Sequence, residues 1–88
     1  RQSMELKQGV YRHFKGKLYR LIGVAHHSET MEKLVVYQAL YGERGLWVRP
    51  ASMWLETVER DGKAFQRFTY LAEDEDTARA LLRQRGED

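Results

Sequence analysis

Apolar positions along the chain form short runs that are separated by turns containing glycine. Runs rich in β-branched and aromatic residues, bounded by turn residues, predict β-strands. Gly16 supplies one tight turn, and the Asp61-Gly62 pair is a strong hairpin signal. The predicted strands span residues 9–14, 18–27, 34–41, 46–49, 55–59 and 64–71.

The run over residues 18–27 does not alternate cleanly between apolar and polar positions, because Leu21, Ile22 and Val24 fall on both parities. A glycine inside such a run often marks a bulge or a barrel corner. We therefore expect the strand to bend at Gly23 and to change there which face it buries.

Five or six short strands joined mainly by tight turns predict a mainly-β fold. A small barrel is the economical arrangement, since closing the sheet hides its edges. Pro50 ends one strand, and residues 51–54 are predicted to form a helical turn across a barrel corner. Residues 28–33 are predicted to be a loop or a single helical turn.

The end of the chain has a different pattern, with acidic residues first and arginines later. This order suits the dipole of a helix, which we expect over residues 74–85. Ala78, Leu81 and Leu82 form a narrow apolar stripe that can dock on the barrel.

Eighty-eight residues make one domain. We expect a barrel domain over residues 9–71, a C-terminal helix and tail over 72–88, and a loosely held segment over 1–8. The three residues before Met4 look like a tag remnant.

The composition is that of an ordinary soluble domain, with 42% hydrophobic and 32% charged residues. The chain has no cysteine, which excludes disulfides and thiolate metal sites and favours a reducing, cytoplasmic location. No apolar run approaches the roughly 20 residues of a membrane span. The formal charge of +2 permits a nucleic-acid partner but does not indicate one, because no dense basic stripe is present.

Histidines and carboxylates offer the first candidate chemistry. His26 and His27 are neighbours, so on a regular strand they point to opposite faces. A zinc site needs three or four convergent ligands, and here it would have to combine His27 and Glu29 with a residue of another strand. The pattern therefore favours solvated or hydrogen-bonded histidines, with neither a metal nor another cofactor.

Ser28 beside His27 suggests a nucleophile and its base, but adjacent residues rarely align in this way, and no orienting acid is evident. The alternative is structural. Ser28 or Thr30 would cap a short turn, with Glu29 near its positive end. We assign no catalytic residue.

Aromatic residues cluster between positions 37 and 54, beside two arginines. We expect Tyr37 to be interior together with Leu46 and Val48. Trp47 and Arg49 have the opposite parity and should share the other face. This pair is typical of a binding site, but it is equally typical of an indole covered by an arginine stem.

Four segments resemble one bacterial family, the domain of unknown function numbered 1653: "GVYRHFKGKLYRLIGVAHHSET", "LVVYQALYG", "LWVRPASMWLETV" and "GKAFQRFTYL". The resemblance covers residues 9–71 and implies a compact SH3-like barrel, but no activity. Some polar residues of the family pattern have no evident role in forming a turn or ending a strand. In this chain they are Arg12, His13, His27, Ser28, Glu29 and Arg49.

These observations favour a non-enzymatic binding module that recognises a polar or anionic ligand or a protein partner as a monomer or weak dimer. The ligand would bind at a rim where the His27–Thr30 loop meets the strand end. The proposed ligand-binding residues are His13, His27, Ser28, Glu29, Tyr41, Trp47 and Arg49. One alternative is a small hydrolase or metal-dependent enzyme using His13, His27 and Glu29, and another is a nucleic-acid-associated accessory domain.

Overall fold

The computed structural model describes residues 6–86 and contains seven strands and two helices in that range. The elements are β1 (Gly9–His13), β2 (Leu18–His26), β3 (Lys33–Ala39), β4 (Leu46–Pro50), α1 (Ala51–Trp54), β5 (Thr57–Arg60), β6 (Lys63–Gln66), β7 (Phe68–Ala72) and α2 (Glu75–Gln84).

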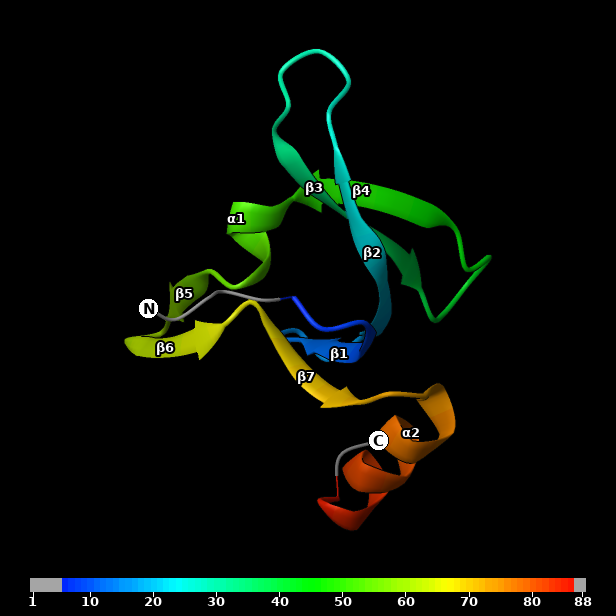
Figure 1. Ribbon diagram of the computed structural model, residues 1–88. Helices are drawn as coiled ribbons and strands as arrows, with labels where there is room; N and C mark the ends of the chain where they lie inside the picture. The colour runs from blue at the N-terminus through cyan, green and yellow to red at the C-terminus, as the bar shows by residue number, and fades with distance from the viewer. Residues whose placement is uncertain (1–5, 87–88) are drawn as a thin grey trace.

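The strands form two antiparallel sheets. Five of them make one sheet in the order β4-β3-β2-β1-β7, and β5 and β6 make a separate hairpin. Figure 1 shows the β2–β3 hairpin extending away from the rest of the sheet, with α2 on the opposite side of the molecule beyond β1 and β7. The predicted mainly-β class with a C-terminal helix is confirmed. The main sheet is not closed into a barrel, because β4 and β7 remain its two edges.

The predicted last strand, residues 64–71, is two strands. β6 pairs with β5, whereas β7 pairs with β1. The chain changes partners at Arg67, whose amide donates to the carbonyl of Glu56 at 2.8 Å and whose carbonyl accepts from the amide of Phe14 at 2.9 Å. The continuous apolar pattern gave no sign of this change, since both strands carry aromatic residues.

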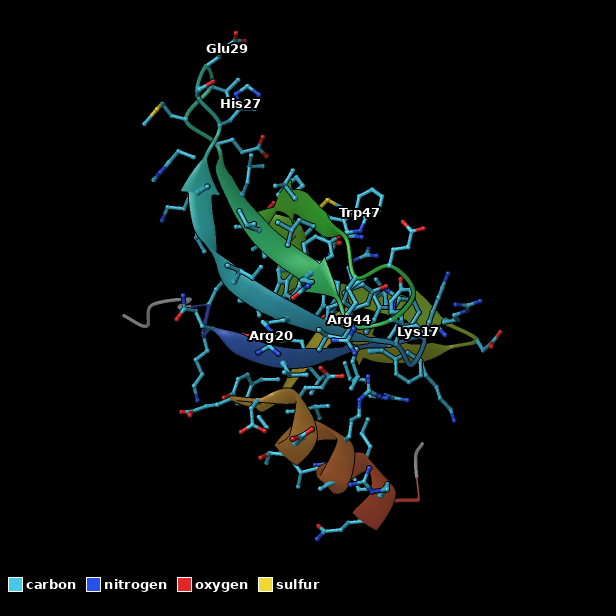
Figure 2. The ribbon with its side chains drawn as sticks, turned by 90° about the vertical axis from the view of Figure 1, so that its right-hand side faces the viewer. Lys17, Arg20, His27, Glu29, Arg44 and Trp47 are labelled. Atoms are coloured by element: carbon cyan, nitrogen blue, oxygen red, sulfur yellow. The ribbon has the colours of Figure 1, made fainter. Side chains whose placement is uncertain are left out.

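The predicted bend at Gly23 is confirmed. The pairing of β2 with β3 shifts register between Leu21 and Gly23. A bulge adds one residue to a strand and increases its local twist. The two halves of β2 therefore run in different directions, as the bent hairpin in Figure 2 shows.

The sheet has a hydrophobic core on each face. Val10 and Tyr11 are neighbours on β1 and therefore point to opposite faces. The first core lies under α2 and contains Val10, Leu18, Leu40, Ala72, Ala78 and Leu82. The second core is mostly aromatic and contains Tyr11, Leu21, Val35, Tyr37, Trp54 and Phe68.

Helix α2 begins and docks as its sequence predicts. The carboxylate of Asp74 accepts the amide hydrogen of Thr77 at 2.7 Å, which caps the first turn. Ala78 and Leu82 are buried against the first core. The predicted apolar stripe is thus confirmed as the docking face.

An arginine–glutamate network links α2 to the β3–β4 turn. Both carboxylate oxygens of Glu75 accept from the guanidinium of Arg44, at 3.0 and 3.1 Å. Arg79 also donates to Glu75, at 3.0 Å, and to the carbonyl of Leu40, at 3.1 Å. These hydrogen bonds lower the pKa of Glu75 to about 2, the contact with Arg44 contributing most.

Residues 6–8 contact the sheet. Leu6 packs against the aromatic core, and the carbonyl of Lys7 accepts the hydroxyl hydrogen of Tyr11 at 2.8 Å. Gln8 donates to the carbonyl of Ile22 at 2.6 Å. The rest of the predicted loose segment, residues 1–5, lies outside the described residues. Between residues 6 and 86, no helix is long and apolar enough to cross a membrane.

Candidate functional site

Each strand of the main sheet contributes one side chain to a group that we call the Arg49 cluster. Following the sheet order from β4 to β7, its members are Arg49, Tyr37, Tyr19, His13 and Phe68. The four rings contact one another edge to face. Their centres lie 5.6 Å apart for Tyr19 and Tyr37, 6.2 Å for His13 and Tyr19, and 5.0 Å for His13 and Phe68.

The cluster exists because the sheet is strongly curled. In a flat sheet, four strand spacings of about 4.8 Å would place the two edge strands roughly 19 Å apart. The guanidinium carbon of Arg49 on β4 nevertheless lies 5.6 Å from the ring centre of Phe68 on β7. It also lies 6.0 Å from the ring of Tyr37. The two edges therefore face each other without being hydrogen-bonded.

Arg49 is a half-buried cation without a carboxylate partner among residues 6–86. Its Nε atom is buried and has no hydrogen-bond acceptor within the same range. Stacking on aromatic rings stabilises an arginine by about 0.5–2 kcal/mol. A buried donor that stays unsatisfied costs about 1–3 kcal/mol. The residue as a whole is only half-buried, so an anion at the exposed part of its guanidinium would supply the missing counter-charge.

His13 adds a neutral donor to the cluster. Its Nδ1 atom accepts the amide hydrogen of Lys15 at 3.1 Å, so the ring proton of the neutral imidazole is on Nε2. Burial lowers the pKa of His13, and the charges of Arg49, Arg67 and Lys15 lower it further. At neutral pH, His13 is therefore an uncharged donor in a positive environment.

Tyr41 joins the cluster through Tyr19. Their hydroxyl oxygens lie 2.7 Å apart. Burial raises the pKa of Tyr19, and the hydrogen bond with Tyr41 raises it further. The Nζ of Lys17 lies 5.1 Å from the ring centre of Tyr41, so this end of the cluster also carries a cation.

Trp54 forms the floor beneath the cluster. Its ring stacks on Phe68 with centres 3.7 Å apart and planes inclined by 4°. The side chain is fully buried, and in the described part of the chain its indole Nε1 has no acceptor.

The predicted loop residues His27, Ser28 and Glu29 lie elsewhere. Val24, Val35 and Arg49 form one cross-strand row, and His27 is three residues, roughly 10 Å, beyond it. Figure 2 shows His27 and Glu29 at the tip of the β2–β3 hairpin.

The imidazole of His27 has a structural role at this tip. Its Nδ1 accepts the amide hydrogens of Glu29 at 3.1 Å and Thr30 at 3.3 Å. The structure thus brings together His13, Tyr41 and Arg49 from the predicted set, but not the hairpin tip.

The expected faces of β4 were assigned wrongly. Trp47 pairs with Tyr37, so Trp47 and Arg49 point to the side of Tyr37. Leu46 and Val48 point to the other side and are 64% and 60% exposed, but Trp47 is also 60% exposed, so on its own face only Arg49 is partly covered. The alternation of side chains along the strand correctly placed Trp47 and Arg49 on one face. It could not show which face of an edge strand packs against the rest of the protein.

Two members of the cluster were not singled out from the sequence. Tyr19 and Phe68 lie within the predicted strands 18–27 and 64–71, and nothing in those runs marked either of them as a site residue. Across residues 6–86, no three histidine, aspartate or glutamate side chains are arranged to hold a metal ion.

The chain is thus a small mainly-β domain with a curled, open sheet. Residues 9–70 match the family model described as "Protein of unknown function (DUF1653)", and the chain belongs to this family. It is similar to the crystal structure of a DUF1653 protein from Bordetella bronchiseptica, with a TM-score of 0.74 and 36% identity over 82% of this chain and 95% of that one. No curated protein matches the sequence.

Proposed function

We propose that this domain is a non-enzymatic binding module and that its Arg49 cluster recognises an anionic ligand. The observation that carries the proposal is the guanidinium of Arg49, which is held over Tyr37 and Phe68 while its buried Nε lacks an acceptor in the described chain. An anionic ligand group at the exposed part of this half-buried guanidinium would supply the counter-charge that Arg49 lacks.

The neighbouring donors support the same ligand class. His13 offers Nε2–H, and the charge of Lys15 acts on the same position, whereas Arg67 is already paired with Glu56 at 2.8 Å. Arginine favours carboxylate or phosphate because its planar fork matches two oxygens of such a group. A neutral histidine beside it adds one further hydrogen bond.

The competing explanation is structural, with the arginine stem covering aromatic rings. Arg49→Met separates the two explanations, because methionine keeps an apolar stem and removes the guanidinium. Arg83→Met is a matched control, since Arg83 is an exposed arginine in the last turn of α2.

The test is calorimetric titration with inorganic pyrophosphate, together with thermal melting of each variant. We expect Arg49→Met to weaken pyrophosphate binding at least tenfold. This corresponds to roughly 1.4 kcal/mol or more, the contribution of a charge-assisted hydrogen bond that the variant loses. Arg83→Met should bind pyrophosphate like wild type. Equal binding by wild type and Arg49→Met, or no binding by wild type, would count against the proposal. A large loss of melting temperature in Arg49→Met alone would make Arg49 a structural residue.

A further inference from the structure

We propose that the anionic ligand is single-stranded nucleic acid, with bases that stack on Phe14 and Phe65 and phosphates that contact Lys15, Arg60 and Lys63. This inference rests on the proposed function, because it names the class of the anionic ligand and extends its contacts from the Arg49 cluster to the adjoining surface. It is carried by a groove beside the Arg49 cluster.

The groove lies between the β1–β2 turn and the β5–β6 hairpin. Its volume is about 490 Å³, within the roughly 300–1,000 Å³ of small-molecule sites. Its lining consists of Phe14, Lys15, Arg60, Asp61, Lys63 and Phe65.

Two phenylalanine rings form the apolar part of this groove. The ring centres of Phe14 and Phe65 lie 6.4 Å apart, and their planes are inclined by only 19°. Phe65 is 41% exposed, so a base can reach its ring. A flat π-system suits these ring faces regardless of base identity.

The charges around the rings complement a phosphate backbone. The guanidinium carbon of Arg60 lies 5.8 Å and the Nζ of Lys15 lies 5.9 Å from the ring centre of Phe14. Lys63 is the third cation, and Asp61 is the one acid of the lining. None of the three cations forms an ion pair with a carboxylate of residues 6–86, so each can contact phosphate.

The groove continues into the Arg49 cluster. The rings of Phe14 and His13 lie 4.6 Å apart, and His13 in turn contacts Phe68. A strand whose base stacks at Phe65 would thus place a neighbouring phosphate toward His13 and Arg49. An acidic peptide would use the cations but would gain little from two parallel ring faces.

The test measures the affinity for a fluorescein-labelled single-stranded oligonucleotide of about 12 nucleotides, a length within the range of small-domain sites. We compare wild type with Phe65→Ala, Phe65→Tyr and Val48→Ala. Val48 is the control position, because its exposed apolar side chain lies on the face of β4 opposite Arg49. We expect Phe65→Ala to weaken binding by about fivefold or more, while Phe65→Tyr and Val48→Ala bind like wild type. Four phosphate contacts, at Lys15, Arg60, Lys63 and Arg49, predict a log–log salt slope of about −3.

The same variants are titrated with pyrophosphate, which has no base to stack. Phe65→Ala should bind pyrophosphate like wild type, whereas Arg49→Met should lose affinity for both probes. Pyrophosphate binding that depends on Arg49, without oligonucleotide binding, would overturn this inference and leave the proposed function standing. Oligonucleotide binding that depends on Phe65 but not on Arg49 would refute the role of the Arg49 cluster instead. Tighter binding of a poly-glutamate peptide of equal charge would assign the groove to an acidic protein and overturn the inference.

Discussion

The arginine network around Glu75 predicts a measurable loss of stability when its charge is removed. Glu75→Gln keeps the size of the side chain but eliminates the anion that Arg44 and Arg79 share. This anion joins α2 to the β3–β4 turn, so its loss weakens a contact between distant segments. Glu43→Gln is the matched control, because Glu43 is an exposed acid of the same turn without an ion pair to a described residue.

The magnitude follows from the pKa and from the exposure of the partners. A pKa of about 2 in place of the ordinary 4.5 sets an upper bound of roughly 3 kcal/mol. The side chain of Arg44 is 47% exposed and that of Glu75 is 20% exposed, so solvent screens the pair. We therefore expect Glu75→Gln to lower the free energy of unfolding by about 1–2 kcal/mol.

Urea denaturation at low salt provides the measurement, repeated from pH 7 to pH 2. The folded-state pKa of Glu75 is depressed, so its contribution is complete above about pH 4.5 and disappears as the pH falls toward 2. The difference between wild type and Glu75→Gln should shrink over that range. The reasoning would be refuted if Glu75→Gln matched Glu43→Gln at pH 7, or if its deficit persisted unchanged at pH 2.

Three further predictions concern backbone, core and histidine. Gly9→Ala should lower the free energy of unfolding by more than about 1 kcal/mol, because Gly9 has a φ of +141° and a Cβ there would lie 2.8 Å from the carbonyl oxygen of Ala72. A Cβ at Gly23 would meet open space, so Gly23→Ala should leave the melting temperature nearly unchanged. Trp54→Phe should cost much less in urea denaturation than the roughly 3–5 kcal/mol of Trp54→Ala, since the lost indole nitrogen has no acceptor in the described chain. The pKa of His13 is lowered in the folded protein, so below pH 6.5 the unfolded chain binds a proton at this histidine before the folded chain does, and stability falls. His13→Gln removes the histidine, so the stability of this variant should fall less steeply below pH 6.5. Equal effects of the two glycine variants, equal costs of the two tryptophan variants, or an unchanged pH slope would contradict the respective prediction.

Local patterns predicted most of the elements correctly. Turn glycines, the bulge at Gly23 and the charge order of α2 depend on residues close together in the chain. The break at Arg67 was missed because it results from a change of pairing partner, which an apolar run does not reveal.

The site was predictable only in part for a related reason. Arg49 and His13 were selected as polar residues near strand ends, but their meeting depends on the curl of five strands. No local pattern encodes that curl, so Phe68 was overlooked. The hairpin tip with His27 was selected because its polar residues are adjacent in sequence, and these residues mainly hold the turn.

The most direct test of the Arg49 cluster is an NMR titration of the ¹⁵N-labelled protein with pyrophosphate, following the Nε–H signal of Arg49 and the amides of His13, His27 and Glu29. The account predicts saturable shifts at Arg49 and His13, with the hairpin tip unchanged. Shifts confined to His27 and Glu29, or no shift at Arg49 at saturating pyrophosphate, would contradict it.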